Sequence, residues 1–512
     1  MGALVHAFML RGIDALPCEV EVHFAQHGLP QVCVVGLPDA AVRESIERVR
    51  QSIEASAMEM PRHHIVVNLA PAGTRKEGSV YDLPIALGIL AADGAVDPRR
   101  DGAPRVADWV VGGELALDGR LRAVRGAVSA ALHARAQGRG LLVPAVNAFE
   151  ASLVPGVRVV GADSLADVVE FFRGNFDGVR EACRGVTATG ATQTASGPGS
   201  IDFREIRGQT AARRAMLIAA AGEHNVLLLG PPGCGKTMLA RALPGILPPL
   251  TPEQSLEVLR IASCVGVPMP THCNGALHVP RPVRAPHHGA SASAILGGGP
   301  NGRPGEVTLA HRGILFLDEL PEYRRDVLEG LREPLESGEV AVARASGSVT
   351  WPALALLVAA MNPSRDGGAG SGARGARLRA EYMSKISGPV LDRIDLHVAL
   401  RPLTLADFSR ARMGESTDEL RARVERARSR SFARQGSVLN ARLSGHELDR
   451  VCGFAPGARD LLLRGLDEMH LSARGYDKLR RVALTIADLA GADTVDEAAV
   501  AEALQYRALG AP

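Results

Sequence analysis

The residues best suited to chemistry in this sequence lie at 226–237, which read VLLLGPPGCGKT. An apolar run from Val226 to Leu229 ends in a glycine-rich loop, and Lys236 and Thr237 follow where we expect a helix to begin. Glycines let backbone N–H groups turn toward phosphate oxygens, and the helix N-terminus adds positive potential. The pattern therefore predicts a loop that holds the phosphates of ATP. Its residues are Gly230, Pro231, Pro232, Gly233, Cys234, Gly235, Lys236 and Thr237.

The last two side chains of this loop have separate roles. We expect Lys236 to reach the outer phosphates and Thr237 to offer its hydroxyl to Mg²⁺. A compact ammonium on a flexible stem fits a phosphate loop where a planar guanidinium does not. A lysine here is informative, because only four of the 58 basic side chains are lysines, namely Lys76, Lys236, Lys385 and Lys478. For the other three lysines, the alternative to a functional role is that they are present by chance.

A second apolar run, ILFLDE at 314–319, ends in two acids. We expect Asp318 to hold Mg²⁺ through water and Glu319 to polarise the water molecule that attacks the terminal phosphate. An ordinary strand end is the alternative, but a buried strand has little structural reason to end in two carboxylates. Together with the phosphate loop, these acids predict ATP hydrolysis.

Three further polar residues could complete the reaction. Asn362 ends the apolar run ALALLVAAMNP and fits a group that senses the γ-phosphate and orients water, although an Asn before Pro363 also forms turns. Arg393 in SGPVLDRIDLHV and Arg474 in LSARGYDKLRRVA could each place a guanidinium on the charge that develops during hydrolysis. Because most basic side chains in this chain are arginines, spacing alone also allows both to be ordinary surface residues.

These residues require an α/β fold in which strands and helices alternate around a doubly wound core. The 512 residues suffice for about three domains. Residues 1–173 mix apolar strand-like runs with helical stretches and predict a first α/β domain. Small polar residues concentrate at 184–200, so we place a linker at 174–200. The ATPase core is then expected at 201–402, and the helical, arginine-rich pattern of 403–512 predicts an all-helical domain.

Composition restricts the partners and the compartment. A net charge of +2 gives no global field for nucleic acid, so any DNA-binding surface must be local. Seven cysteines without a CxxC pair disfavour a disulfide framework or a zinc site and fit a reducing cytoplasm. The apolar run Ala353–Met361 is too short to cross a bilayer, and the N-terminus lacks the basic region of a signal peptide. We therefore expect a cytoplasmic protein without a membrane segment.

Several segments together resemble the YifB/ComM proteins, a family of AAA+ ATPases of the magnesium-chelatase-like group. They are GPPGCGKTMLARALPGILPPL, RPVRAPHHGAS, GEVTLAHRGILFLDELPEY, AAMNP, SGPVLDRIDLHV and LSARGYDKLRRVALTIADLAG. The resemblance covers nearly the whole chain and implies a homo-hexameric ring with ATP at the subunit interfaces and a helical lid at 403–512. It implies that Arg393 is an arginine finger that reaches a neighbour's ATP. It also implies that Arg474 is a sensor-2 arginine over its own nucleotide, and that the partner is DNA.

The same group carries hairpins that project into the pore of the ring. The segment GEVAVARASGSVTW at 338–351 predicts such a hairpin, and its Arg344 could contact a DNA phosphate or be a solvated strand residue. The adjacent His287 and His288 match the family, but we assign them no chemistry and expect a polar loop rather than a metal site. Many relatives carry a cysteine cluster after the Asn-Pro pair. This chain has none there, so we expect no zinc.

Two N-terminal segments, PAGTRKEGSVYDLPIALGILAA and VVGGELALDGRLRAVRGAVSAALHA, resemble the proteolytic domain of Lon proteases. That domain uses a Ser–Lys dyad, in which the lysine activates the hydroxyl. Here Val80 occupies the place of the nucleophile, Val128 occupies the place of the lysine, and Ser79 lies one residue away. We therefore expect a Lon-protease-like fold without peptidase activity. The lysine Lys76, retained nearby, suggests a different role for this domain.

The favoured hypothesis is an ATP-driven DNA motor, which the family resemblance implies to be a helicase that promotes branch migration of incoming DNA during natural transformation. A magnesium-chelatase motor for tetrapyrroles is less consistent, because that enzyme has no Lon-like domain and this chain has no DxSxS metal-binding domain. An ATP-dependent protease is opposed by the missing dyad. A regulatory ATPase that remodels protein partners stays open. Hydrolysis stimulated by DNA separates the first hypothesis from the others.

Overall fold

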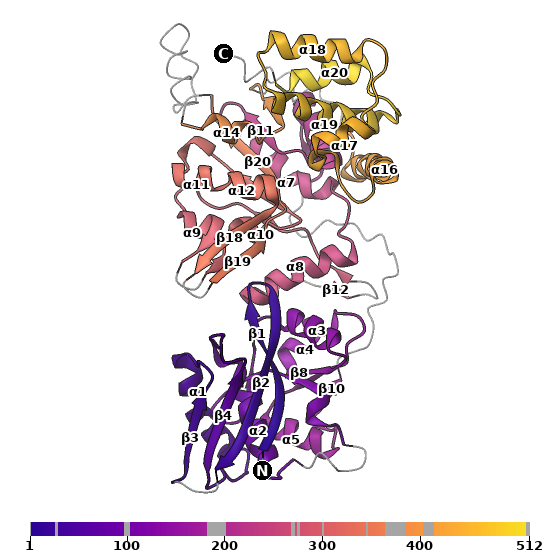
Figure 1. Cartoon of the computed structure of the whole chain (residues 1–512). Helices are drawn as coiled ribbons and strands as arrows, with labels where there is room; N and C mark the ends of the chain where they lie inside the picture. Colours follow the sequence, from indigo (N-terminus) through magenta and orange to yellow (C-terminus); the bar gives the residue numbers. More distant parts are fainter. Residues whose placement is uncertain are drawn as a thin grey trace. The chain divides into compact units, whose positions relative to one another are not determined.

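The computed structural model describes residues 2–25, 29–96, 103–181, 201–267, 272–273, 277–299, 302–344, 347–363, 385–402 and 414–507. The chain forms two compact units (Figure 1). The first unit contains residues 1–191, 251–279 and 344–349, and the second contains residues 192–250, 280–343 and 350–512. The units are described separately.

A mixed eight-stranded sheet forms the centre of the first unit, in the order β10-β9-β8-β5-β1-β2-β4-β3. The long strands β1 and β2 pair antiparallel, whereas β1 and β5 pair parallel. The strands are β1 (Gly2–Arg11), β2 (Asp14–Ala25), β3 (Gln31–Val35), β4 (His64–Ala70), β5 (Trp109–Val111), β8 (Gly140–Pro144), β9 (Val159–Ala162) and β10 (Val179–Glu181). In β2 and β4, buried residues alternate with more exposed ones, so one face of the sheet lies on the core.

Helices and a short hairpin complete the first unit. They are α1 (Ala40–Ala55), α2 (Asp82–Ala92), α3 (Ala127–Ala136), α4 (Ala145–Ser152), α5 (Leu165–Arg173) and the hairpin of β6 (Glu114–Leu115) and β7 (Leu121–Arg122). A short 3-10 helix, η1 (Ser79–Tyr81), precedes α2. Helix α2 packs on β1 and β2 and is apolar and buried along almost its whole length, which explains its lack of a polar face.

The first unit also contains a helix from the middle of the sequence, α8 (Pro252–Val265). A capping box of Thr251 and Gln254 begins this helix. The carbonyl of Ser263 accepts a hydrogen bond from the backbone N–H of Gly126 at 2.9 Å, just before α3, and Arg260 lies 2.5 Å from Asp14. Helix α8 therefore packs against α3 in the first unit, whereas the sequence predicts a single ATPase core over 201–402.

Part of the predicted linker at 174–200 belongs to the sheet of the first unit. Strand β10 lies inside this range because Val179 to Glu181 pair antiparallel with β9 and extend the sheet by one strand. Residues 182–200 are outside the described part of the chain.

A five-stranded sheet forms the centre of the second unit, in the order β14-β17-β20-β11-β21, and all its neighbouring strands are parallel. The strands are β11 (Val226–Leu229), β14 (Val283–Arg284), β17 (Ile314–Leu317), β20 (Leu356–Met361) and β21 (Leu396–Ala399). Strands β17 and β20 consist only of buried apolar residues. Continuous apolar runs of this kind are typical of parallel strands covered on both faces.

Short helices and strands surround this sheet. They are η3 (Phe203–Glu205), α6 (Thr210–Gly222), α7 (Lys236–Ile246), α9 (Ala292–Leu296), β15 (Gly297–Gly298), β16 (Arg303–Pro304), α10 (Glu306–Leu309), η4 (Leu320–Glu322), α11 (Arg325–Gly330), α12 (Arg332–Ser337) and α14 (Gly388–Leu391). Two further hairpins are present. One pairs β12 (His272–Cys273) with β13 (Leu277–His278) within the residues of the first unit, and the second pairs β18 (Glu339–Arg344) with β19 (Gly347–Pro352). The second one confirms a hairpin at the predicted 338–351.

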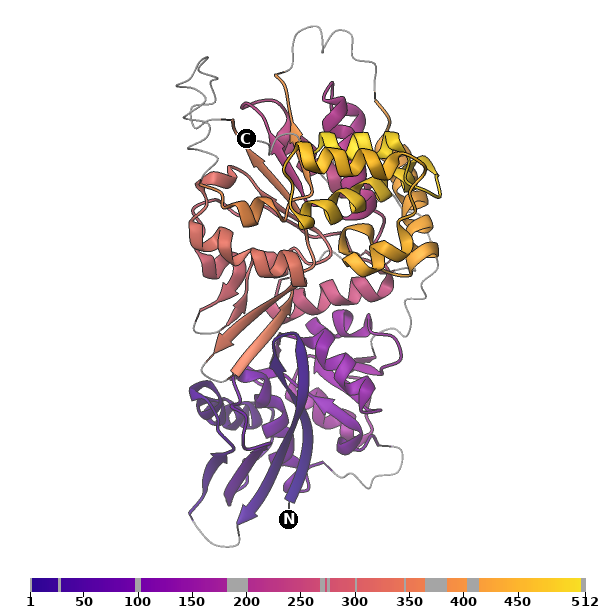
Figure 2. The same ribbon diagram turned by 45° about the horizontal axis from the view of Figure 1, so that its top comes forward.

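The C-terminal part of the described chain is helical, as the pattern from 403 onward predicts. It contains α16 (Thr417–Gln435), η5 (Asn440–Arg442), α17 (Gly445–Val451), α18 (Ala458–Glu468), α19 (Ala473–Ala490) and α20 (Glu497–Gln505). Figure 2 shows these helices, in yellow, gathered together. Helix α19 packs on α6 and α16, and its apolar face joins the core of the second unit.

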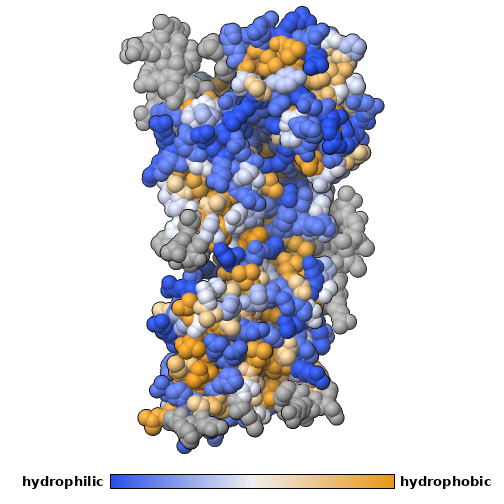
Figure 3. Space-filling model, in the orientation of Figure 1, coloured by the Kyte–Doolittle hydropathy of each residue, from blue (hydrophilic) through white to orange (hydrophobic). Residues whose placement is uncertain are grey.

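Within the described residues, no helix is long and apolar enough to cross a membrane. On the face shown in Figure 3, hydrophilic and hydrophobic residues are interspersed.

Candidate nucleotide-binding site

The sheet of the second unit brings the predicted site residues to one edge. Strand β20 pairs with both β11 and β17, with Leu229 opposite Met361 and Leu317 opposite Ala359. Because all three strands are parallel, the residues that follow them lie at the same edge of the sheet. These residues are the loop from Gly230, the acids from Asp318 and the amide of Asn362.

The backbone of the loop explains two of its glycines. Gly235 has a φ of 95°, a left-handed conformation that side chains other than glycine rarely adopt, and it precedes α7 directly. A Cβ on Gly230 would lie 2.8 Å from Sγ of Cys234 and 2.9 Å from the carbonyl oxygen of Leu400. The helix therefore begins at Lys236 with its N-terminus toward the loop, as a phosphate-binding site requires.

The ammonium of Lys236 lies inside the loop, and the residue is only 8% exposed. It donates to the carbonyl oxygens of Gly230 at 2.7 Å and Pro231 at 3.0 Å, and to Oδ1 of Asn362 at 3.0 Å. The predicted phosphate-binding lysine and the predicted γ-phosphate sensor are thus in direct contact.

The two predicted Mg²⁺ ligands also lie together. Oγ1 of Thr237 is 3.4 Å from Oδ2 of Asp318, and both side chains are exposed at this contact. Oδ1 of Asp318 accepts the backbone N–H of Glu319 at 2.9 Å, which fixes the carboxylate. A hydroxyl and a carboxylate oxygen at a helix N-terminus form a donor set that suits Mg²⁺ with phosphate and water ligands. The residues present therefore fit ATP with Mg²⁺.

Glu319 has an unusual backbone. Its φ of 52° and ψ of 48° are in the left-handed region, which is rare for a residue with a side chain. Backbone strain of this kind often occurs at functional residues, where the surrounding structure holds it. Glu319 is half exposed at the edge of the sheet, next to Asp318.

A residue without an expected role contacts Glu319. Nδ1 of His288 lies 3.2 Å from Oε2 of Glu319. The ring of His288 packs on that of His287, with centroids 4.1 Å apart, and faces the edge of Tyr323. The hydroxyl of Tyr323 donates to the carbonyl of Pro286 at 2.6 Å, and burial, together with the charges of Asp318 and Glu319, raises its pKa. The segment of His288 follows β14, which adjoins β17 in the sheet, so strand order decides this contact.

Arg393 is not among the groups gathered around Lys236. Its guanidinium donates to the carbonyl of Pro389 at 2.6 Å and to Glu336, and only 9% of its side chain is exposed. Arg474 lies exposed in the first turn of α19. Arg344 ends strand β18, and its side chain lies outside the described part of the structure.

In the first unit, the positions compared with the Ser–Lys dyad have other contacts. Val128 is fully buried in α3, and its N–H lies 3.4 Å from Oγ of Ser263 in α8. Val80 lies in η1, and Ser79 beside it donates to Glu114. Lys76 is fully buried and donates to the carbonyl of Pro71, which favours a role within the fold.

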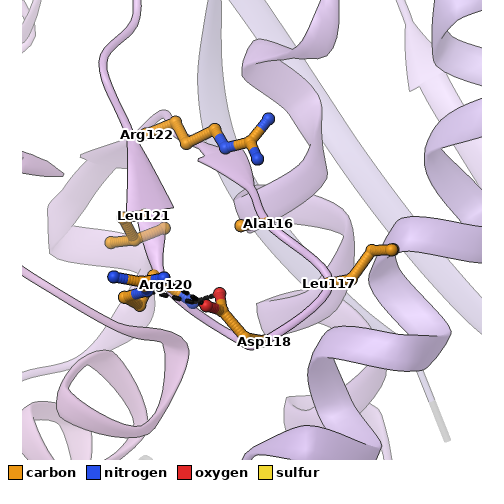
Figure 4. A pocket seen from close by; sticks show the side chains of 6 residues that line it. All are labelled: Ala116, Leu117, Asp118, Arg120, Leu121 and Arg122. Carbon is orange, nitrogen blue, oxygen red and sulfur yellow. Dashed lines mark hydrogen bonds and ion pairs between the residues drawn. The ribbon is translucent and has the colours of Figure 1, made fainter.

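Figure 4 shows a surface pocket of the first unit. The residues that line it are distant in the sequence from the predicted nucleotide-binding residues of the second unit. The hairpin of β6 and β7 lines it with Ala116, Leu117, Asp118, Arg120, Leu121 and Arg122. Arg120 and Asp118 form an exposed ion pair with each other at 2.7 Å. We assign no ligand to this pocket.

Three families of magnesium-chelatase proteins match parts of this chain. The family described as "Magnesium chelatase, subunit ChlI" matches residues 202–408, "Subunit ChlI of Mg-chelatase" matches 20–147, and "Magnesium chelatase, subunit ChlI C-terminal" matches 414–507. A protein called "Magnesium-chelatase 38 kDa subunit" from Cereibacter sphaeroides is 29% identical over 186 residues, which cover 31% of this chain and 52% of that protein.

Two relatives match along the whole chain. "Uncharacterized protein YifB" of Salmonella typhimurium is 41% identical over 511 residues, which cover 99% of this chain and 97% of the relative. "Competence protein ComM" of Haemophilus influenzae is 40% identical over 510 residues, with the same two coverages. Magnesium-chelatase-like AAA+ membership implies ATPase activity with ATP and Mg²⁺. On this evidence, the chain belongs to the YifB/ComM family of magnesium-chelatase-like proteins.

Proposed function

We propose that this protein is a cytoplasmic, ATP-driven DNA motor that assembles as a homo-hexamer and catalyses branch migration when incoming DNA is recombined during natural transformation. The ATPase part is supported by the contact of Lys236 with Asn362 beside the pair of Thr237 and Asp318. The DNA part is supported by the 40% identity with a competence protein along nearly the whole chain.

The side chains divide the work of hydrolysis. Bound ATP with Mg²⁺ supplies the phosphoryl group that water attacks. Lys236 would leave its carbonyl partners to neutralise the outer phosphates, and Thr237 and Asp318 would hold the ion. Glu319 accepts the proton of the attacking water, and Asn362 orients that water.

Arg393 acts on a neighbouring subunit in this proposal. In the structure its guanidinium contacts Pro389 and Glu336 of its own chain, and these contacts do not involve the phosphate loop. In a ring, the guanidinium would stabilise the charge that develops on the next subunit's phosphates, an effect worth roughly 10³–10⁵ in rate in the best cases. Arg474, exposed on α19, would cover the nucleotide of its own subunit.

The first unit is proposed to have a Lon-protease-like fold without peptidase activity. Buried Val128 offers neither a proton nor a base, and Val80 offers no nucleophile. Arg344 stays a candidate DNA contact in its hairpin. The alternative function is an AAA+ ATPase that remodels protein partners through the same ring, since the described residues of the nucleotide site are not specific for DNA.

The decisive experiment measures ATP hydrolysis and strand exchange in the same tube, with and without a synthetic four-way DNA junction. We expect the junction to stimulate hydrolysis and to be resolved into duplexes only with ATP. Lys236→Ala should abolish both activities, because it removes the phosphate-binding cation. Hydrolysis that is indifferent to DNA, with the junction intact, would favour the protein-remodelling alternative.

A further inference from the structure

A buried polar network in the second unit joins α19 to the turn that carries Arg393. At its centre is Asp395, which is 7% exposed and lies two residues after Arg393. One carboxylate oxygen lies 3.5 Å from Nζ of Lys478, and the other lies 3.3 Å from Nδ1 of His224. Nε2 of His224 contacts Oγ1 of Thr485 at 2.8 Å. Because Lys478 and Thr485 both belong to α19, this helix holds Asp395 directly and also through His224.

The backbone on both sides of this contact is fixed to the sheet. Nδ2 of Asn225 donates to the carbonyl of Arg393 at 3.1 Å, and the carbonyl of Asn225 accepts the N–H of Asp395 at 3.0 Å. Nζ of Lys478 also lies 3.5 Å from the carbonyl of Ile394. The backbone from Arg393 to Asp395 therefore has partners on α19 and at the start of β11, and its position sets where the Arg393 side chain begins.

Helix α19 also carries the exposed Arg474 in its first turn. Arg474 and Lys478 are four residues apart, and Thr485 follows seven residues later, so the three side chains lie along one face of a continuous helix. A movement of α19 that follows contact between Arg474 and nucleotide would therefore also move the groups that hold Asp395. Helix α19 therefore connects Arg474 with the groups that hold Asp395 next to Arg393, without a flexible segment between them.

The network also explains a retained lysine. Lys478 is one of four lysines in the chain, is 9% exposed, and lies between a carboxylate and a carbonyl. Burial lowers its pKa to about 8, although Asp395 acts in the opposite direction. Burial alone would raise the pKa of Asp395, but Lys478, the hydrogen bond with His224 and Arg507 hold it below its usual value. A compact ammonium suits this confined position better than a planar guanidinium.

We propose that Lys478 is a positioning residue for Arg393. The C-terminal helices lie over the nucleotide of their own subunit in the proposed function. The Lys478–Asp395–His224 network transmits the position of these helices to Arg393, which acts on the nucleotide of the neighbouring subunit. This inference rests on the proposed function, because it requires Arg393 to act in the neighbour's site. It goes further by naming the residues that couple one site to the next.

The test uses mixed oligomers of full-length chains. Arg393→Ala chains keep a working Glu319 but cannot serve a neighbour, whereas Glu319→Gln chains cannot hydrolyse but can donate Arg393. Mixing the two should restore ATP hydrolysis at the interfaces where a Glu319→Gln chain donates its arginine to an Arg393→Ala chain. If the two parent variants fail to complement each other, the shared site is wrong and both the proposed function and this inference fall.

Lys478→Met is then introduced into one partner at a time. When it is in the donor, Glu319→Gln, we expect the restored activity to fall by roughly 10- to 100-fold, since small misplacements of a catalytic group have effects of this size. When it is in the recipient, Arg393→Ala, we expect the restored activity to remain. A loss only in the recipient would show that Lys478 serves its own site, and an equal loss in both would indicate general damage. Either result would overturn the inference while leaving the shared site intact.

A milder variant guards against misfolding. Thr485→Val keeps the shape of the side chain but removes the hydroxyl that contacts His224, and we expect the same donor-specific loss with a smaller size. Arg459, an exposed cation on α18, provides the matched control. Arg459→Met should leave the restored ATP hydrolysis unchanged in both the donor and the recipient. Donor activity of Thr485→Val equal to that of the control would contradict the role of the His224 branch.

Discussion

Glu319 combines a strained backbone with a neighbour that restrains its side chain. Its φ of 52° lies in the left-handed region, and the histidine His288 contacts its carboxylate at 3.2 Å. A general base needs both reach and orientation, and a second group that orients the base is a common arrangement in catalysis. Glu319 and the histidine in contact with it come from segments 31 positions apart in the sequence.

For Glu319→Gln we expect ATP binding at wild-type affinity and a loss of turnover by about 10²–10⁴, because the amide keeps the shape of the side chain but cannot accept the proton. Phosphate release gives the turnover, and a fluorescent nucleotide gives the affinity. Turnover at the wild-type rate would remove Glu319 from the catalytic role.

For His288→Ala we expect kcat to fall between about 10- and 100-fold with little change in nucleotide affinity, because Glu319 loses its orienting contact. His287→Ala is the comparison, since His287 stacks on His288 while His288 is the histidine that contacts Glu319 in the described part of the chain. The same kinetic assay over a nucleotide titration separates kcat from KM. Equal effects of the two variants would show that the loop, rather than the His288 contact, matters.

At the scale of elements, each unit is held by contacts between helices that are distant in sequence. In the first unit, Arg48 of α1 binds Asp82 at the start of α2, with Nε 2.8 Å from Oδ2 and Nη2 3.1 Å from Oδ1. Asp82 is fully buried. In the second unit, Arg434 of α16 binds Asp488 of α19 at 2.7 Å. Such pairs fix one packing of helices whose apolar faces alone would tolerate several.

The pair in the first unit predicts a pH dependence of stability. Burial raises the pKa of Asp82 to about 6, although Arg48 acts in the opposite direction. Between about pH 4 and pH 6, the folded chain therefore holds more of this proton than the unfolded chain. The contribution of Asp82 to the free energy of unfolding should thus fall as pH rises through this range and stay constant above it.

Chemical denaturation of the wild type and of Asp82→Asn over pH 4 to 7 measures this contribution. The chain has two tryptophans, so a Trp351→Phe background leaves Trp109 to report on the first unit. We expect the free energy of unfolding of the wild type minus that of Asp82→Asn to decrease toward pH 6. A difference that is constant across the range would contradict the raised pKa.

At the scale of the whole molecule, the proposed role of Arg393 in a neighbouring subunit would make activity depend on assembly. If Arg393 acts in trans, a single chain lacks a complete site. We expect ATP turnover per chain to fall when the protein is diluted below the concentration at which rings form. Turnover by Arg393→Ala should stay low at every concentration.

Sedimentation at the same concentrations would show whether the fall in turnover coincides with dissociation of the hexamer. Turnover per chain that is independent of concentration, with monomers present, would contradict a shared site.

The sequence by itself determined the family and the α/β class, and it predicts the chemistry of the phosphate loop. It could do so because a phosphate loop is local: Gly230 to Thr237 are contiguous, and their spacing alone allows the loop to surround phosphates. Asp318 and Glu319 directly follow the apolar run ILFL, so adjacent residues alone also predict their role. The family assignment is confirmed by relatives that match along the whole chain. The Lon-like fold of the first unit, the lid and the DNA substrate stay predictions.

Only the tertiary structure decided which distant residues meet. The order of parallel strands brings Asn362 to Lys236 and His288 to Glu319, and packing of α19 brings Lys478 to Asp395. It also places α8 with the N-terminal sheet, although that helix follows the phosphate loop in the sequence. These contacts depend on strand order and on the burial of several apolar faces at once, which no local spacing encodes.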